Sequence, residues 1–413
     1  MANTSITLDD KFNLVRSNVL LNGTQGLVRL MLGQKQRDEK LGLNTAGFVT
    51  GYRGSPLGAV DFQMRRASKQ LVDSKIQFKE ALNEDLATTA LWGSQQAELR
   101  GEGLYDGVFG LWYGKGPGVD RSGDAMRHAN MAGSSVNGGV LMAMGDDHTG
   151  ESSTVLHQSD LAMIDAGMPI LSPAGVQEIL DYGYYGFALS RYSGLWVGLK
   201  TMKDTIEVTS VVDGDPLRMK FKVPKTRSGT EHLNIRLVDT PADQEKRLFN
   251  DKKAAAEEFA RANKIDKIVL PNLKSKIGLV AAGKNWLDLI HALSLLGINE
   301  NEAKALGITS YKIVQTWPID RKSLLEWADQ LDVIIVVEEK RKIVETQIKD
   351  ALFSISSKTR VYGGHKNDDK LFFDHGVLDP LDIAAALGQI FKEEGCSNCL
   401  LYTSDAADDS LRV

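Results

Sequence analysis

The sequence predicts an α/β protein in which parallel sheets are flanked by helices. Short apolar segments alternate with segments of helical periodicity along most of the 413 residues, a pattern typical of βαβ units. Many of the 39 glycines lie in short clusters between these segments, where they suit tight turns and a close approach of the backbone to a ligand. Hydrophobic residues make up 42% and charged residues 25%, which is ordinary for a globular chain.

The elements of the first half follow in order. Residues 14–38 have scattered apolar positions and are expected to form a helix. A strand over Ala46–Thr50 runs into the Gly/Pro turn of "GYRGSP", and helical periodicity returns in "DFQMRRASKQLVD". The strand "IQFKEAL" precedes a helix in "NEDLATTALWGSQ". The strands in "YDGVFGLWYGKGPGVD" and "GGVLMAMGDDH" each run into a polar loop, with the helical segment "SGDAMRHANMAGSS" between them.

The second half begins with a change of character. Residues 213–275 are charged and interrupted by Pro and Gly, which predicts an edge strand and a surface helix. From the strand "KIGLVAAG" onward, strands and helices alternate again in a smaller α/β unit. These breaks predict a first domain over 10–235, a connector over 236–275, a second domain over 276–395 and a separate tail over 396–413.

Composition narrows the classes of function. The net charge of −5 gives no basic footprint for nucleic acid and no polybasic patch for a membrane surface. No stretch approaches the about 20 apolar residues of a membrane span, and the N-terminus lacks the pattern of a signal peptide. The only cysteines, Cys396 and Cys399, exclude a disulfide scaffold. We therefore expect a cytoplasmic protein.

The tail does not match either domain. Its "LLYTSDAADDSLRV" resembles translated adapter sequence found at the ends of some gene predictions, so we expect the natural protein to continue beyond this point. A single C-x-x-C pair is a weak signal for a redox or zinc site. No function is therefore assigned to Cys396 and Cys399.

Four polar segments fall at the predicted carboxyl ends of strands, where open α/β sheets bind ligands. They are "GYRGSPLG", "NED", "GKGPGVDRSG" and "GDDHTGESST". Ordinary turns also use Gly, Asp and Ser, so each segment alone is equally compatible with a structural role. Asp146, Asp147, His148 and His157 could mimic a metal cluster, but the two acids and His148 are adjacent rather than on one helical face, and no metal site is predicted. No nucleotide fingerprint or nucleophile elbow is present.

Several collinear segments carry a resemblance to a known family. They are "GYRGSPLG", "NEDLATTALWGSQ", "YDGVFGLWYGKGPGVDRSGDAMRHANMAG", "GGVLMAMGDDH", "SSTVLHQS" and "MPILSPAGVQE". Together they closely resemble the N-terminal part of the long, fused indolepyruvate:ferredoxin oxidoreductases, which belong to the thiamine-diphosphate-dependent 2-oxoacid:ferredoxin oxidoreductases. The segments "KIGLVAAGKNWLD", "WPID" and "VVEEKR" are similar to the transketolase C-terminal-like domain of that family. The resemblance implies a thiamine-diphosphate-binding fold, with a pyrimidine-binding-type domain followed by that smaller domain.

Glu84 matches the glutamate that this family uses for catalysis. The resemblance implies that its carboxyl group hydrogen-bonds the aminopyrimidine ring of thiamine diphosphate, because a carboxyl shielded from water can share a proton with a ring nitrogen. Local rules offer a simpler alternative. Asn83 is a good N-cap, and acidic side chains such as Glu84 and Asp85 favour the first turn of a helix. The family match favours the catalytic role for Glu84 and leaves the dipole role to Asp85.

The resemblance also suggests contacts for other segments. Ser55 matches a hydroxyl residue near the substrate 2-oxoacid, and Arg53 could pair with the substrate carboxylate or form a surface ion pair. Cofactor contacts are expected from the segments that contain these residues: Gly54, Lys115, Gly116, Asp146, Asp147 and His148. A Cys-Lys pair usually follows "DDH" in the family, whereas Gly150 and Glu151 stand here, which changes the charge of that loop.

The sequence lacks the rest of the family's machinery. It has no "GDG…N" motif for the diphosphate and Mg²⁺ and no cysteine set for an iron–sulfur cluster, which needs four thiolates. We therefore expect half of a cofactor site, completed by missing C-terminal domains or by a partner subunit, in an enzyme that forms a homodimer.

The resemblance implies a function for the whole enzyme. It would oxidatively decarboxylate an aryl or other 2-oxoacid to an acyl-CoA, with CoA as co-substrate and ferredoxin as electron acceptor. A non-catalytic remnant of the same fold and a non-oxidative thiamine-dependent decarboxylase are the alternatives.

Overall fold

The computed structural model describes residues 7, 10–151, 155–225, 233–271 and 274–396. The chain divides into two compact units. The first contains residues 1–264 and 315–318, and the second contains residues 265–314 and 319–413. Of the predicted connector over 236–275, the helical part lies in the first unit, and the strand β9 (Lys267–Leu270) lies in the second. The tail 397–413 lies outside the described residues.

The first unit is built on a seven-stranded sheet with the order β12-β6-β7-β5-β4-β2-β3. Its strands are β2 (Ala46–Gly51), β3 (Ile76–Phe78), β4 (Val108–Lys115), β5 (Val140–Asp146), β6 (Ile170–Leu171), β7 (Val197–Met202) and β12 (Gln315–Trp317). All neighbours are parallel except β12, which joins the edge strand β6 in the antiparallel sense. The prediction of an α/β fold on a parallel sheet is therefore confirmed.

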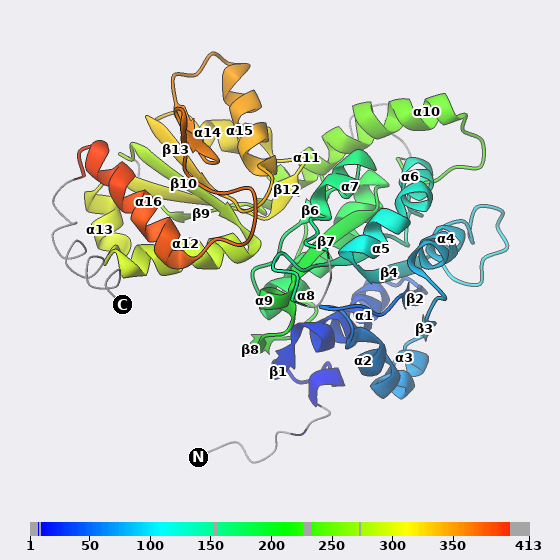
Figure 1. The fold of residues 1–413 in the computed structure, drawn as a ribbon. Helices are drawn as coiled ribbons and strands as arrows, with labels where there is room; N and C mark the ends of the chain where they lie inside the picture. The colour runs from blue at the N-terminus through cyan, green and yellow to red at the C-terminus, as the bar shows by residue number, and fades with distance from the viewer. Residues whose placement is uncertain (1–6, 8–9, 152–154, 226–232, 272–273, 397–413) are drawn as a thin grey trace. The chain divides into compact units, whose positions relative to one another are not determined.

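Helices flank this sheet (Figure 1). They are α1 (Gly23–Lys40), α2 (Val60–Arg66), α3 (Ser68–Asp73), α4 (Glu84–Ser94), α5 (Gly116–Arg121), α6 (Gly123–Ala132), α7 (Asp160–Asp165), α8 (Val176–Ser193), α9 (Lys203–Ile206), α10 (Pro241–Lys246), the π-helix η2 (Arg247–Lys252) and α11 (Lys253–Asn263). The core beneath α4, α5 and α6 gathers Leu91, Trp112, Val119, Met126 and Met142. Burial of such side chains stabilises the layer by about 1.5–3 kcal/mol each.

Two predictions about local structure were wrong. The helix expected over 14–38 starts only at Gly23, because Asn22 and Gln25 form a capping box there. The residues before it form the strand β1 (Asn18–Asn22), which pairs with β8 (Thr209–Asp213). The expected loop after β4 is the helix α5, whose first turn contains Pro117, a residue that fits the start of a helix because it needs no amide donor there.

The second unit is a three-layer α/β domain. Its sheet has the order β14-β13-β10-β11-β9, and only β9 is antiparallel. The other strands are β10 (Ile277–Ala282), β11 (Ile308–Ile313), β13 (Val333–Val337) and β14 (Arg360–Tyr362). The helices α12 (Gly283–Leu295) and α16 (Pro380–Glu393) pack with the side chains of alternate residues of β10 and β13, whereas the intervening residues meet α14 (Arg321–Ala328) and α15 (Ile343–Phe353) (Figure 1). The short elements α13 (Glu300–Ala305), β15 (His365–Lys366) and β16 (Asp369–Lys370) complete the unit.

Within the described ranges, no helix combines the length and the apolar character that crossing a bilayer requires.

Candidate functional site at the carboxyl edge of the first sheet

The predicted site residues follow the carboxyl ends of neighbouring parallel strands. Residues 53–55 follow β2, Glu84 follows β3, Lys115 ends β4 and Asp146 ends β5. Because β2, β3, β4 and β5 are parallel neighbours, these ends lie along one edge of the sheet. The prediction that the polar segments share one edge is therefore confirmed, while their roles as ligands remain predictions.

Glu84 is the first residue of α4, and its main chain is firmly held. The side chain of Asn83 caps the helix by accepting a hydrogen bond from the Leu86 amide at 3.0 Å. The carbonyl oxygen of Glu84 accepts hydrogen bonds from Trp112 Nε1 at 3.1 Å and from Thr88 Oγ1 at 3.0 Å. The helix start is therefore already capped without the Glu84 carboxylate.

The Glu84 side chain is buried against α5. Only 6% of the residue is exposed, and a Cβ placed on Gly118 would lie 2.5 Å from Glu84 Cγ and Oε1. Among the described residues, no donor contacts the carboxylate. Because the described residues leave its two acceptor oxygens unused, the carboxylate is suited to accept a hydrogen bond from a ligand. The Asp85 side chain, in contrast, is 41% exposed and pairs with Arg121 at 3.4 Å.

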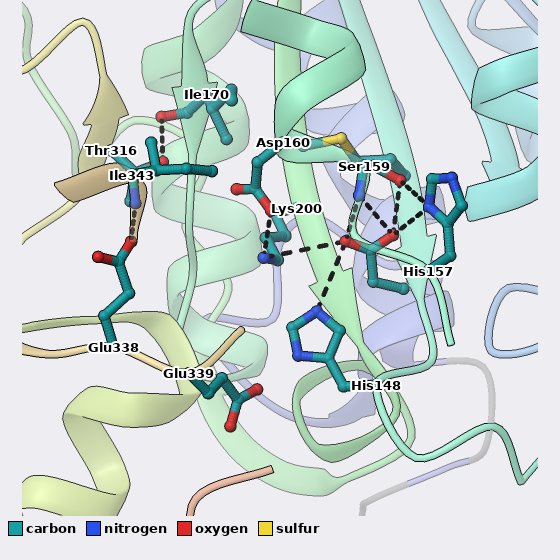
Figure 2. A network of polar contacts seen from close by, with 12 residues as sticks. His148, His157, Ser159, Asp160, Ile170, Lys200, Thr316, Glu338, Glu339 and Ile343 are labelled. Carbon is teal, nitrogen blue, oxygen red and sulfur yellow. Dashed lines mark hydrogen bonds and ion pairs between the residues drawn. The ribbon is translucent and has the colours of Figure 1, made fainter. Parts of the chain in front are cut away.

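Asp146 is the centre of a buried polar network (Figure 2). Ser159 donates to its carboxylate from Oγ at 2.5 Å and from its amide at 3.0 Å. His157 Nδ1, Lys200 Nζ and His148 Nε2 approach within 3.6–3.9 Å. Burial alone would raise the pKa of Asp146, but its contacts with His148, His157 and Lys200 outweigh burial and lower the pKa. Asp146 is therefore a fixed negative charge beneath the site.

His157 bridges this network to α5. Its Nε2 lies 2.7 Å from Asp120 Oδ2, and 11% of its side chain is exposed. Burial lowers the pKa of His157, but the nearby carboxylates of Asp146 and Asp120 reverse the effect and raise it. The sequence analysis considered His157 only as a metal ligand, and it missed Ser159 and Lys200 as site residues. The available signals were the polar run "HQSD" after a strand end and the one lysine within the strand "VGLKTM".

The glycines of the site make room for side chains. A Cβ on Gly54 would lie 2.9 Å from Lys115 Cδ, and one on Gly116 would lie 2.3 Å from His157 Nδ1. Lys115 and Gly116 are thus brought together with the segment after β2 and with the Asp146 network. Arg53 is exposed, and Ser55 is half-buried. Their contacts with substrate remain predictions.

The loop after β5 is held largely by its own hydrogen bonds. Asp147 Oδ1 accepts bonds from the Gly150 amide at 3.0 Å and the Glu151 amide at 3.3 Å. Glu151 forms an ion pair with Lys203, and His148 is 3% exposed. Asp147 therefore shapes the turn. In the part of the chain that the structure describes, no group of three or more His, Cys, Asp or Glu residues could hold a metal ion.

Proteins of known fold support this architecture. The 2-oxoglutarate:ferredoxin oxidoreductase from Magnetococcus marinus superposes with a TM-score of 0.64 at 14% identity, covering 91% of this chain and 66% of that chain. A split-gene transketolase superposes with a TM-score of 0.52 at 13% identity, and the superposition covers 89% of this chain and 98% of that chain. At these identities the likeness shows the fold alone, and it confirms the expected fold class.

Sequence comparisons find similar proteins in one family. A family model described as an indolepyruvate oxidoreductase domain matches residues 267–408. The indolepyruvate oxidoreductase subunit IorA of Pyrococcus horikoshii is 25% identical over 364 residues, which cover 87% of this chain and 51% of that protein. The IorA subunit of Methanothermobacter marburgensis is 22% identical over 319 residues, which cover 77% of this chain and 47% of that protein. The chain thus spans about half the length of these relatives. The family model and these relatives agree with the motifs of the first unit, and they confirm the resemblance to the indolepyruvate oxidoreductase family.

Proposed function

We propose that this chain forms the part of a 2-oxoacid:ferredoxin oxidoreductase that holds the pyrimidine ring of thiamine diphosphate. The complete enzyme would release CO₂ from an aryl or other indolepyruvate-like 2-oxoacid, transfer the acyl group to the sulfur of CoA, and pass two electrons to ferredoxin. The names of the IorA relatives support the oxidoreductase class. The related fold from M. marinus was solved with 2-oxoglutarate, CoA and succinyl-CoA, which supports the substrate types.

The observation that carries this proposal is the environment of Glu84. Glu84 is 6% exposed at the carboxyl edge of a parallel sheet, the helix cap is supplied by Asn83, and no donor from the described residues contacts its carboxylate. A carboxylate is an acceptor with two oxygens, so a ligand that reaches this edge can donate a hydrogen bond to Glu84. The residues therefore fit a ring with a hydrogen-bonding nitrogen.

Each remaining residue has a proposed task. Glu84 would hold and protonate the aminopyrimidine, and the cofactor, when bound, supplies carbanion chemistry. Gly118 leaves space for the Glu84 side chain. Ser55 and Arg53 would contact the 2-oxoacid, Arg53 through its carboxylate. Gly54, Lys115 and Gly116 would border the cofactor, and Asp146 and His148 would support that border from below.

The proposal includes a second half of the site elsewhere. The diphosphate, its Mg²⁺ and an iron–sulfur cluster would be bound by the remaining domains or a partner subunit, in a cytoplasmic homodimeric enzyme. The relatives named IorA are themselves subunits, and this chain spans about half of their length, which supports such an arrangement.

The test compares Glu84→Gln with Asp85→Asn in the complete enzyme. The assay is 2-oxoacid- and CoA-dependent reduction of a viologen dye. Glu84→Gln keeps the size of the side chain but removes its acid–base function, so we expect activity to fall at least about 100-fold, within the range for general acid–base catalysis. Asp85→Asn should retain most of the activity because Asp85 is exposed. Full activity of Glu84→Gln would refute the proposal. CO₂ release without dye reduction would favour the non-oxidative decarboxylase instead.

A further inference from the structure

We propose that His157 is a positioning residue that ties helix α5 to the buried Asp146 and thereby fixes the surface against which Glu84 lies. This inference rests on the proposed function for its link to catalysis, but the tie itself is a property of the chain. It assigns a task to a histidine that neither touches Glu84 nor belongs to the predicted site.

The two faces of α5 meet different partners. Gly116 and Asp120 are four residues apart and therefore share one face of the helix. Both meet His157: Asp120 through the 2.7 Å contact with Nε2, and Gly116 because its missing side chain leaves room for the imidazole ring. Gly118 lies between them in sequence and faces the other way, where it meets Glu84. A displacement of α5 would therefore move the surface that confines the Glu84 carboxyl group.

His157 adds to the contacts that hold this short helix. The helix has six residues, and an isolated helix of this length is unstable in water, so its position depends on packing. Val119 anchors it in the core, and Arg121 pairs with Asp85 in a weak surface interaction. His157 instead connects α5 to β5, a strand in which every residue is buried. Figure 2 shows His157 beside Ser159. His148 Nε2 and Lys200 Nζ lie 3.9 and 3.8 Å from the Asp146 carboxylate.

The charges around His157 favour its protonated form. Asp120 faces it from α5 and Asp146 from β5, at 2.7 and 3.6 Å. The opposing cation is Lys200 of β7, which is shared between Asp146 at 3.8 Å and Asp160 at 2.5 Å, and His148 also faces Asp146. Two carboxylates thus raise the pKa of His157 despite its burial. Because the folded pKa is raised, the tie is complete below the unfolded pKa and is lost as the pH rises through the folded pKa.

The experiment measures amide hydrogen exchange of residues 116–122 in the full chain, with rates corrected for the intrinsic effect of pH. In the wild-type chain, protection of α5 should fall as the pH rises through the pKa of His157, which NMR of its ring nitrogens measures independently. In His157→Gln the protection should be about tenfold lower at pH 6 and should no longer vary with pH.

Two further variants make the test specific. Asp120→Asn changes only the partner on α5, whose side chain is 61% exposed. It should reproduce the loss of α5 protection even if His157→Gln does not fold. His128→Gln is the matched control, because His128 pairs with Asp124 in the same way at 3.7 Å but on the surface of α6. It should leave α5 unchanged. Unchanged protection in both His157→Gln and Asp120→Asn would overturn the proposal.

The link to catalysis is tested separately. In the complete enzyme, His157→Gln should lower kcat several-fold at pH 6 and make it less dependent on pH, with little change in KM. If Glu84→Gln remains active, the proposed function fails while the exchange result still stands. If Glu84→Gln is inactive but His157→Gln keeps the wild-type pH profile, only the positioning role fails.

Discussion

Substituting Gly118 by alanine tests whether the space beside Glu84 matters. The backbone at Gly118 is helical and accepts alanine, which would by itself stabilise a helix by about 1 kcal/mol. The new Cβ, however, would lie 2.5 Å from Glu84 Cγ and Oε1 and 2.7 Å from Cδ, closer than real contacts allow. Overpacking of this kind costs about 1–3 kcal/mol. The free energy of unfolding should therefore fall by about 0–2 kcal/mol.

Activity should respond far more than stability. Glu84 can avoid the clash only by moving its carboxyl group, and a displacement of about 1 Å in a catalytic group can reduce the rate about 100-fold. Viologen reduction by the complete enzyme measures this effect. The control is Gly93→Ala in α4, where an added Cβ meets nothing within 4 Å, so activity should be unchanged.

A double-mutant cycle checks the physical reasoning without any activity. In a Glu84→Ala chain the clashing atoms are absent, so Gly118→Ala should be about 1–3 kcal/mol less destabilising there than in the wild-type chain. Urea denaturation measures both differences. Equal effects in the two backgrounds, or Gly118→Ala with full activity, would refute the idea that Gly118 sets the position of Glu84.

Two further predictions concern buried cations. Arg29 is fully buried and donates hydrogen bonds to main-chain carbonyls, which include those of Gly214 at 3.1 Å and Lys11 at 3.0 Å. Arg29→Met removes this charged donor and leaves the carbonyl acceptors without a partner. The free energy of unfolding, measured by urea titration, should therefore fall by about 3–5 kcal/mol. Burial, with a contribution from Arg247, lowers the pKa of Lys252 from its ordinary 10.5 to about 7. The unfolded chain therefore binds more protons between these values, and this residue makes stability rise with pH from about 7 to 10.5. Lys252→Met should flatten that slope, and a slope equal to that of the wild-type chain would contradict the assignment.

Part of this site could be predicted from the sequence alone. Apolar strand segments followed by polar turns indicate which residues reach the carboxyl edge of a parallel sheet, and Glu84, Lys115 and Asp146 all lie there. The cap at Asn83 was also correct, because capping depends on residues close in sequence.

The rest depends on contacts between residues that are distant in sequence. Asp120 and His157 are 37 residues apart, and no local rule pairs them. The same is true of Gly118, which was expected in a loop, and whose importance comes from Glu84 on another helix. Glycine clusters after strands indicated turns or ligand contact, whereas here the glycines at 54, 116 and 118 also accommodate neighbouring side chains.

The edge strand β12 has a consequence for the order in which the chain folds. It completes the sheet of the first unit, although residues 265–314, which precede it, belong to the second unit. During synthesis the first sheet therefore remains open at β6 until residue 318 has left the ribosome. An unpaired edge of this kind can pair with another chain. Between the synthesis of Lys264 and that of Pro318, the nascent first unit therefore lacks the strand that covers this edge in the folded chain.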